Sequence, residues 1–117
     1  MTGVRLVLVD NDLSALELID LDLALEGHEI VGRAVQGEEA VEIVAREQPD
    51  LVVIDYRMPP GIDGMEAARR IRKRWPQIRV LLYSNYMREE LLREADRIGA
   101  TYLRKGDLES LRRAIAG

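Results

Sequence analysis

The sequence contains no cysteine and only one histidine, His28. The absence of cysteine excludes a disulfide scaffold, a thiol nucleophile and a cysteine-ligated metal. One histidine is too few for a histidine-rich metal cluster and argues against a catalytic triad built on histidine. No apolar run approaches the roughly 18 residues that cross a bilayer, and the N-terminus lacks a basic region followed by a long apolar core. We therefore expect neither a membrane span nor a signal peptide.

The sequence also lacks an excess of basic residues: it has 17 Lys and Arg and 21 Asp and Glu, which gives a net charge of −4. Binding to nucleic-acid phosphates needs a surplus of positive charge on one face, so we expect no direct contact with nucleic acid. The chain does have an ordinary globular balance, with 47% hydrophobic and 32% charged residues over 117 positions. That length and composition predict one folded domain over residues 1–117.

Five short apolar runs alternate with segments of helical periodicity. Most of the runs are continuous, as in strands that are buried on both faces of a sheet; they are Val4–Val9, Ile30–Val35, Leu51–Ile54, Val80–Tyr83 and Thr101–Leu103. The helical stripes are Leu13, Leu16, Ile19 and Leu23; Ala40, Val41 and Val44; Met65, Ala68, Ile71 and Trp75; Leu91, Ala95 and Ile98; and Leu108, Leu111 and Ile115. This alternation predicts an α/β domain, a doubly wound five-stranded parallel sheet with helices on both faces.

Polar and charged side chains follow four of the five expected strands. In sheets of this kind, ligand sites form beyond the carboxyl ends of the strands. The residues there are Asp10, Asn11 and Asp12 after the first strand, Asp55 after the third, Ser84 after the fourth and Lys105 after the fifth. We therefore expect three carboxylates, a hydroxyl and an ammonium to meet at one rim of the sheet.

Such a rim suits phosphoryl transfer. An oxygen-rich cluster fits Mg²⁺, which takes one or two carboxylates and leaves positions for water and phosphate oxygens. A carboxylate such as Asp55 can act as a nucleophile and form an acyl phosphate, while a metal, Lys105 and Ser84 neutralise the transferring group. Each residue also has a plainer interpretation: Asp12 as a helix cap, Ser84 as a turn residue and Lys105 as a solvated charge. Their convergence at four strand ends favours the functional interpretation.

Along its whole length the chain resembles the receiver domain of bacterial two-component response regulators. The segments that carry the resemblance are Leu6–Asp12, Pro49–Asp55 with Met58-Pro59 and Asp63-Gly64, Tyr83–Asn85 and Gly99–Lys105. The resemblance implies a flavodoxin-like sheet with strand order 2-1-3-4-5, the order of a known member of this family. It also implies a cytoplasmic switch rather than an enzyme, although one that assists its own phosphorylation and hydrolysis.

The resemblance further implies a role for each residue at the rim. Asp55 would accept a phosphoryl group from a histidine on a partner protein. Mg²⁺ would be held by Asp10, Asp55, the main-chain carbonyl of Arg57 and the side chain at position 11. Lys105 would pair with a phosphoryl oxygen.

Signalling would depend on Ser84 and Tyr102 in this family. Ser84 would hydrogen-bond the phosphoryl group, and Tyr102 would turn inward as Ser84 shifts. Arg57 and Tyr86 each lie two residues past a site residue, where family members tune how fast the aspartyl phosphate hydrolyses. The implied partner is a sensor histidine kinase or a histidine phosphotransfer protein. A homodimer through the charged fourth and fifth helices is a further expectation, as is an output domain that is absent from this chain.

Three positions depart from the family pattern. The family usually has a second acid directly after the first, where this chain has Asn11. Asn keeps an oxygen ligand but loses a full charge, so Mg²⁺ affinity should fall, and Asp12 is a candidate to compensate. The loop Pro59–Gly64 is one residue longer than the commonest pattern. Gly106 replaces a proline that often follows the family lysine, which removes the opportunity for a cis-proline bond there.

Two alternatives remain open on sequence grounds. The Asn11 departure motivates a pseudo-receiver, a protein-interaction module of the same fold that is not phosphorylated. The segment Asp10–Ser14 resembles the nucleophile loop of haloacid-dehalogenase-type phosphatases, in which Asp10 would be the phosphorylated residue. Ser84 and Lys105 would then supply further motifs, but the segment Asp55–Gly64 would have no explanation. The identity of the phosphorylated carboxylate distinguishes the phosphatase from the receiver.

The first helix carries a second leucine series, Leu18, Leu21 and Leu25, roughly opposite the stripe that should face the core. These leucines either pack against the last helix or form an exposed apolar surface for a partner.

Overall fold

The computed structural model describes residues 3–117, so the first two residues of the expected domain lie outside the described part. Strands and helices alternate strictly along the chain. The strands are β1 (Arg5–Val9), β2 (Glu29–Ala34), β3 (Leu51–Asp55), β4 (Arg79–Ser84) and β5 (Thr101–Arg104). The helices are α1 (Leu13–Leu25), α2 (Gly37–Glu47), α3 (Gly64–Arg74), α4 (Glu89–Ile98) and α5 (Leu108–Ala116). The predicted alternation of strands and helices is confirmed. Within residues 3–117 no helix has the length and hydropathy needed to span a membrane.

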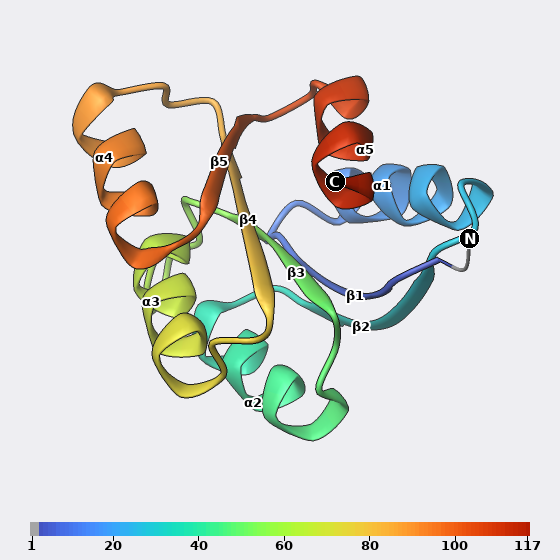
Figure 1. Ribbon diagram of the computed structural model, residues 1–117, viewed down its shortest axis with the longest axis horizontal. Helices are drawn as coiled ribbons and strands as arrows, with labels where there is room; N and C mark the ends of the chain where they lie inside the picture. Colours follow the sequence, from blue (N-terminus) through green and yellow to red (C-terminus); the bar gives the residue numbers. More distant parts are fainter. Residues whose placement is uncertain (1–2) are drawn as a thin grey trace.

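The five strands form one parallel sheet in the order β2-β1-β3-β4-β5, which confirms the expected fold. From β1 the chain moves outward to β2, then returns past β1 to β3 and continues outward in the other direction (Figure 1). Strand order therefore reverses between β1 and β3. Because all strands are parallel, the residues that follow β1, β3, β4 and β5 meet at the same edge of the sheet.

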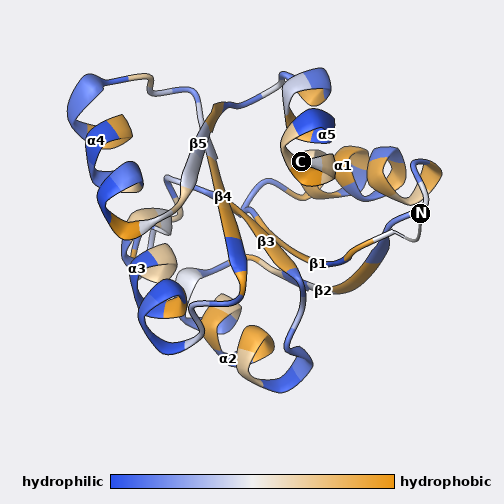
Figure 2. Cartoon of the chain, in the orientation of Figure 1, coloured by the Kyte–Doolittle hydropathy of each residue, from blue (hydrophilic) through white to orange (hydrophobic). Residues whose placement is uncertain are grey.

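Two apolar layers hold the helices against the sheet. Alternate residues of each central strand point to opposite faces, as strand geometry requires. On one face the sheet packs against α2, α3 and α4, and on the other against α1 and α5 (Figure 1). In Figure 2 the central strands β1, β3 and β4 are mainly orange, and α3 and α4 show both orange and blue stretches. The first layer includes Val7, Val52, Val80, Val44 and Ile71, and the second includes Leu8, Val53, Leu81, Leu16 and Leu111.

The stripes differ from expectation at three places. Leu13 is 64% exposed, not part of the core, because it is the first residue of α1 and lies at the rim where the sheet has already ended. Ile43 is buried in α2, whereas Val41 is only partly buried. Leu18, Leu21 and Leu25 are exposed. Of the two alternatives for these three leucines, the structure therefore supports the exposed one, and α5 is joined to α1 by a salt bridge between Arg112 and Asp22.

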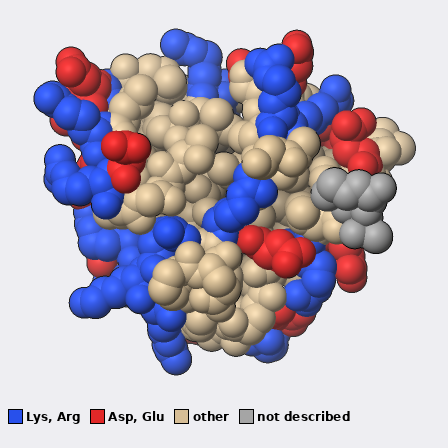
Figure 3. Space-filling model, viewed as in Figure 1, with Lys and Arg blue, Asp and Glu red and all other residues tan. Residues whose placement is uncertain are grey.

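Charge on the surface is uneven despite the net negative total. Figure 3 shows Lys and Arg gathering at the lower left of the view, over α3. That helix carries five basic residues between positions 69 and 74. Several of them have structural partners: Arg69 and Arg70 pair with Glu66, and Arg72 donates to the main-chain carbonyls of Pro76 and Ile78. Arg72 therefore ties the end of α3 to the segment that leads into β4, whereas Arg69 and Arg70 pair within the helix.

Candidate functional site

The functional side chains of the sheet edge come from the last residues of two adjacent strands and from the residues that follow the strands on either side of them. Asp10 follows β1, Asp55 ends β3, Ser84 ends β4 and Lys105 follows β5. In the sheet register Asp55 lies opposite Tyr83, so Ser84 is one residue further toward the rim. The main-chain N–H of Lys105 donates to the Ser84 carbonyl at 2.9 Å, which extends the pairing of β4 and β5 by one residue. The strand ends thus set the relative positions of these residues.

Lys105 bridges the two carboxylates of the site. Its Nζ lies 2.9 Å from Oδ2 of Asp10 and 3.3 Å from Oδ2 of Asp55. Asp10 is fully buried, Asp55 is 6% exposed, and only a fifth of the Lys105 side chain reaches solvent. One ammonium shared by two buried carboxylates leaves a net negative charge at the site whenever both carboxylates are ionised.

Burial and charge work against each other in this group. Burial, and next the nearby charge of Asp10, raise the pKa of Asp55 to about 6, although the Lys105 ammonium opposes the rise. Burial alone would lower the pKa of Lys105, but its hydrogen bond to Asp10 and the two carboxylate charges raise it overall. Lys105 therefore stays protonated at neutral pH, while Asp55 ionises at a higher pH than an ordinary aspartate.

Asp10 is held through both of its carboxylate oxygens. Oδ1 accepts the main-chain N–H of Asp12 at 2.9 Å. Oδ2 accepts the hydroxyl of Tyr83 at 2.5 Å in addition to the Lys105 ammonium. Tyr83 was counted among the apolar residues of its strand and was not expected at the site. The signal that could have revealed it is a phenol near the end of a buried strand, because a buried tyrosine hydroxyl needs a hydrogen-bond partner.

Two of the residues predicted in the acidic loop are exposed, and one of them caps a helix. Asp12 is the N-cap of α1, where its Oδ1 accepts the N–H groups of Ser14 and Ala15. Asn11 and Asp12 are both exposed. Within residues 3–117 no three Asp, Glu, His or Cys side chains form a group that could hold a metal ion. Of the three carboxylates expected at the rim, Asp10 and Asp55 therefore share Lys105, whereas the Asp12 carboxylate caps α1.

The remaining donors still suit a hard divalent cation. The buried pair of Asp10 and Asp55 offers carboxylate oxygens and carries more negative charge than Lys105 neutralises. Mg²⁺ commonly binds through one or two carboxylates, with water and phosphate oxygens filling its other positions. The main-chain carbonyl of Arg57, two residues past Asp55, is a further oxygen of the same kind. The residues present therefore fit magnesium, with fewer charged ligands than the sequence suggested.

Ser84 and Tyr102 both contact the residue at position 86. The buried Ser84 hydroxyl oxygen accepts the main-chain N–H of Tyr86 at 2.9 Å. The Tyr102 hydroxyl donates to the Tyr86 carbonyl at 2.6 Å, and the ring is partly buried. The loop after β4 is thus linked to the end of β4 on one side and to β5 on the other.

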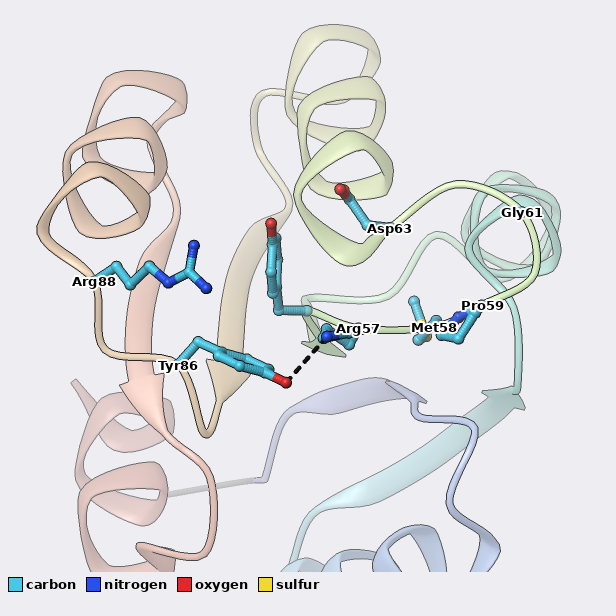
Figure 4. Close-up of a pocket in the computed structure, with 8 residues that line it drawn as sticks. Arg57, Met58, Pro59, Gly61, Asp63, Tyr86 and Arg88 are labelled. Carbon is cyan, nitrogen blue, oxygen red and sulfur yellow. Dashed lines mark hydrogen bonds between the residues drawn. The ribbon is translucent and has the colours of Figure 1, made fainter.

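A hollow of about 280 Å³ lies beside Asp55, between the loops that follow β3 and β4 (Figure 4). Across it, Nη1 of Arg57 donates to the Tyr86 hydroxyl at 3.0 Å, drawn as the dashed line in Figure 4. The guanidinium of Arg88 also lies 5.7 Å from the centre of the Tyr86 ring. The lining residues are Tyr56, Arg57, Met58, Pro59, Gly61, Asp63, Tyr86 and Arg88. The hollow therefore carries two cationic side chains, Arg57 and Arg88, in its lining.

Two glycines beside the site occupy positions that other residues could not take without a clash or strain. A Cβ at Gly64 would lie 2.1 Å from the carbonyl oxygen of Asp55, so only glycine lets the loop return this close to the site. Pro59–Pro60, within the longer loop, is a cis peptide bond. Gly106 has φ +94°, which a proline cannot adopt because its ring holds φ near about −65°. The turn after Lys105 therefore takes a conformation that the usual proline would prevent.

Comparison with known protein families gives a match over almost the whole chain. The family described as "Response regulator receiver domain" matches residues 6–116. The chain is 43% identical over 93 residues to the transcriptional activator protein ExaE of Pseudomonas putida, covering 74% of this chain and 43% of that protein. It is 28% identical over 117 residues to sporulation initiation phosphotransferase F of Bacillus subtilis, covering 98% and 93%.

Not all relatives match in length. A protein-glutamate methylesterase/protein-glutamine glutaminase of a Nocardioides species is 35% identical over 101 residues, which is 86% of this chain and 27% of that protein. The chain thus spans less than half the length of this relative and of the Pseudomonas activator.

Solved structures agree on the fold. The signal receiver domain of the response regulator NarL from Mycobacterium tuberculosis superposes with a TM-score of 0.88 at 29% identity, over 100% of this chain and 99% of that one. A CheX–CheY complex with BeF₃ and Mg²⁺ from Borrelia burgdorferi gives 0.90 at 25% identity, over 98% and 89%.

Proposed function

Because this chain belongs to the response regulator receiver domains of two-component systems, we propose that it is a phosphoacceptor switch that is phosphorylated on Asp55. The donor is a phosphohistidine on a sensor histidine kinase or a histidine phosphotransfer protein. The observation that carries the proposal is the partly buried Lys105 ammonium, shared between the buried Asp10 and Asp55 at the carboxyl edge of the sheet. Residues 1–117 act as one domain in this proposal, with a cytoplasmic location.

The transfer itself is a single displacement at phosphorus. A carboxylate oxygen of Asp55 forms a bond to phosphorus while the bond from phosphorus to the donor histidine nitrogen breaks, which leaves an acyl phosphate and a free histidine. Lys105 stays protonated and faces the acceptor carboxylate, so it can pair with a phosphoryl oxygen. Asp10, Asp55 and the Arg57 carbonyl would hold Mg²⁺, which supplies neutralising charge to the phosphoryl oxygens.

Signalling in this proposal starts from the contacts on Tyr86. A phosphoryl group on Asp55 offers acceptor oxygens to the Ser84 hydroxyl, which now accepts the N–H of Tyr86. When Ser84 turns to donate to the phosphoryl group, the loop after β4 shifts and the Tyr102 hydroxyl loses its place on the Tyr86 carbonyl. The inward and outward states of Tyr102 are then two populations that phosphorylation rebalances.

The hollow beside Asp55 sets the lifetime of the phosphorylated state. Arg57 and Tyr86 are joined by a hydrogen bond, and Arg88 lies against the same ring. They are held in this way over the hollow that Tyr56, the residue after Asp55, also lines, so we propose that they tune autodephosphorylation by limiting the access of water. The chain is in this sense a switch that assists its own chemistry, not an enzyme that turns over a separate substrate.

Two alternatives from the sequence have different standing. Membership of the receiver family removes the phosphatase alternative, in which Asp10 would be the nucleophile; Asp10 is also fully buried, accepts two hydrogen bonds and forms a salt bridge with Lys105. The pseudo-receiver alternative keeps a specific observation in its favour, because Asn11 and Asp12 are exposed and the Asp12 side chain caps α1. A homodimer, and an output domain joined to this one in a longer protein, as in relatives that this chain only partly spans, remain parts of the proposal.

The experiment is to incubate the protein with acetyl phosphate, with and without Mg²⁺, and to weigh it intact. We expect a gain of one phosphoryl group that requires Mg²⁺ and is absent from Asp55→Ala. No gain under conditions in which another receiver domain is fully modified would contradict the proposal and favour the pseudo-receiver.

A further inference from the structure

Tyr83 adds a hydroxyl to the carboxylate pair. Its ring belongs to the apolar layer on the α1 and α5 face and is 4% exposed. From there the phenol reaches across β3, and its hydroxyl donates to Oδ2 of Asp10 at 2.5 Å. The Lys105 ammonium lies 5.3 Å from the centre of the same ring, within the range of a cation–π contact. Tyr83 therefore touches two of the three charged groups of the site without being charged itself.

Counting lone pairs shows what this hydroxyl does to Asp10. An ionised carboxylate has about four lone-pair positions, two on each oxygen. Tyr83 and Lys105 both donate to Oδ2, and the Asp12 N–H donates to Oδ1. About one position is left for any further partner. A cation that approaches Asp10 must use that position or displace a donor that is already there.

We propose that the Tyr83 hydroxyl competes with Mg²⁺ for Asp10, so that the resting site is closed by the protein's own donors and binds the metal weakly. The inference rests on the proposed function, since it concerns the same site. Asn11 acts in the same direction, because it lacks the charge of the acid usual at that position. Tyr83 thus lowers the occupancy of the site by metal.

The surroundings of the Tyr83 ring allow its hydroxyl to donate to Asp10 and also leave room for the ring to move away. Burial, and next the hydrogen bond to Asp10, raise the pKa of Tyr83 far above its usual value, so the phenol remains a donor. A hollow of about 150 Å³ lies beside the ring, lined by Ala15, Leu18, Ile19, Tyr83, Lys105, Gly106 and Leu108. A Cβ at Gly106 would meet no atom within 4 Å. The ring has space to move aside when a cation takes its place on Asp10.

The test is the Mg²⁺ affinity of Tyr83→Phe, measured on the whole chain by following amide NMR shifts during a Mg²⁺ titration at neutral pH. Loss of the competing donor should lower the dissociation constant about three- to tenfold, the upper figure equivalent to roughly 1.4 kcal/mol. Thr101→Val is the control, because it removes an exposed hydroxyl at the start of β5, at the opposite end of that strand from Lys105. Its affinity should equal that of the unaltered protein.

Equal or weaker binding by Tyr83→Phe overturns the inference, and weaker binding would assign the hydroxyl to orienting Asp10 for the metal. If the phenylalanine variant fails to fold, Tyr83→Leu removes the hydroxyl while keeping an apolar side chain, and the same rise in affinity is expected. Phosphorylation by acetyl phosphate is measured in parallel on the unaltered protein. If the unaltered protein is phosphorylated but Tyr83→Phe and Tyr83→Leu bind Mg²⁺ with unchanged affinity, only the role of Tyr83 is contradicted. If the unaltered protein is not phosphorylated, the proposed function is contradicted.

Discussion

Asp55 is buried beside a second carboxylate, and the folded protein tolerates this only because Lys105 stands between the two. Burial and the Asp10 charge raise the pKa of Asp55 from 3.8 to about 6. A raised carboxyl pKa means that the folded state binds a proton more tightly than the unfolded chain. The ionised form of Asp55 is therefore a source of instability that a cation or a phosphoryl group with its metal can relieve.

This instability gives Asp55→Asn a pH-dependent effect on folding. Between about pH 4 and pH 6 the folded wild-type protein holds more protons than the unfolded chain, so its free energy of unfolding falls as pH rises. The asparagine variant lacks that titration. We expect it to match the wild type near pH 4 and to be more stable by about 1–3 kcal/mol near pH 7. Urea unfolding at both pH values, with a metal chelator present, measures the difference.

Glu42→Gln provides a control, since Glu42 is an exposed carboxylate on α2. It should keep the pH profile of the wild type. A stability gap for Asp55→Asn that is the same at both pH values would mean that the ionisation of Asp55 is not what destabilises the fold.

At the scale of single residues, the sequence revealed the groups that strand ends bring together but not their detailed partners. Asp10, Asp55 and Lys105 could be predicted because each lies at the end of a parallel strand, and all such ends meet at one edge. Tyr83 could not, since its hydroxyl reaches Asp10 across β3 and the reach depends on the order of strands. Asp12 had two interpretations in the sequence, and the structure uses it as a helix cap.

Among the helices, α1 shows most clearly what periodicity can and cannot decide. It carries leucine or isoleucine on nearly every side, so the sequence offers two apolar stripes where most helices offer one. The stripe of Leu16, Ile19 and Leu23 is buried as expected. The opposite series is exposed because α5 approaches α1 with charged residues and uses its own apolar stripe on the sheet.

Two alanine substitutions on α1 test this assignment. Leu23 is fully buried and Leu25 is 77% exposed, although they lie two positions apart. Leu23→Ala should cost about 2–5 kcal/mol of unfolding free energy, because it removes buried methyl groups and leaves a cavity. Leu25→Ala should change it by no more than about 0.5 kcal/mol. Urea denaturation of the two variants side by side gives both values, and similar losses in both would show that Leu25 is also covered in solution.

For the whole molecule, the doubly wound topology brings residues that are distant in the sequence together at the site. Lys105 and Asp55 are 50 positions apart in the chain, yet strand order places them in contact. Periodicity and length predict the alternation of strands and helices, and hence the layers. They do not predict which strand lies beside which, and the order 2-1-3-4-5 was available before the structure only through the family resemblance. The contact between Lys105 and Asp55 depends on that order, because β4 must lie between β3 and β5.

If this topology builds a phosphoryl site, the acyl phosphate must form on one carboxylate of the pair. The protein is treated with acetyl phosphate and Mg²⁺, the acyl phosphate is reduced with borohydride, and the reduced residue is identified by tandem mass spectrometry of the digested chain. We expect the reduction at position 55 alone. Reduction at Asp10, or at neither of the two carboxylates, would contradict the assignment of this site.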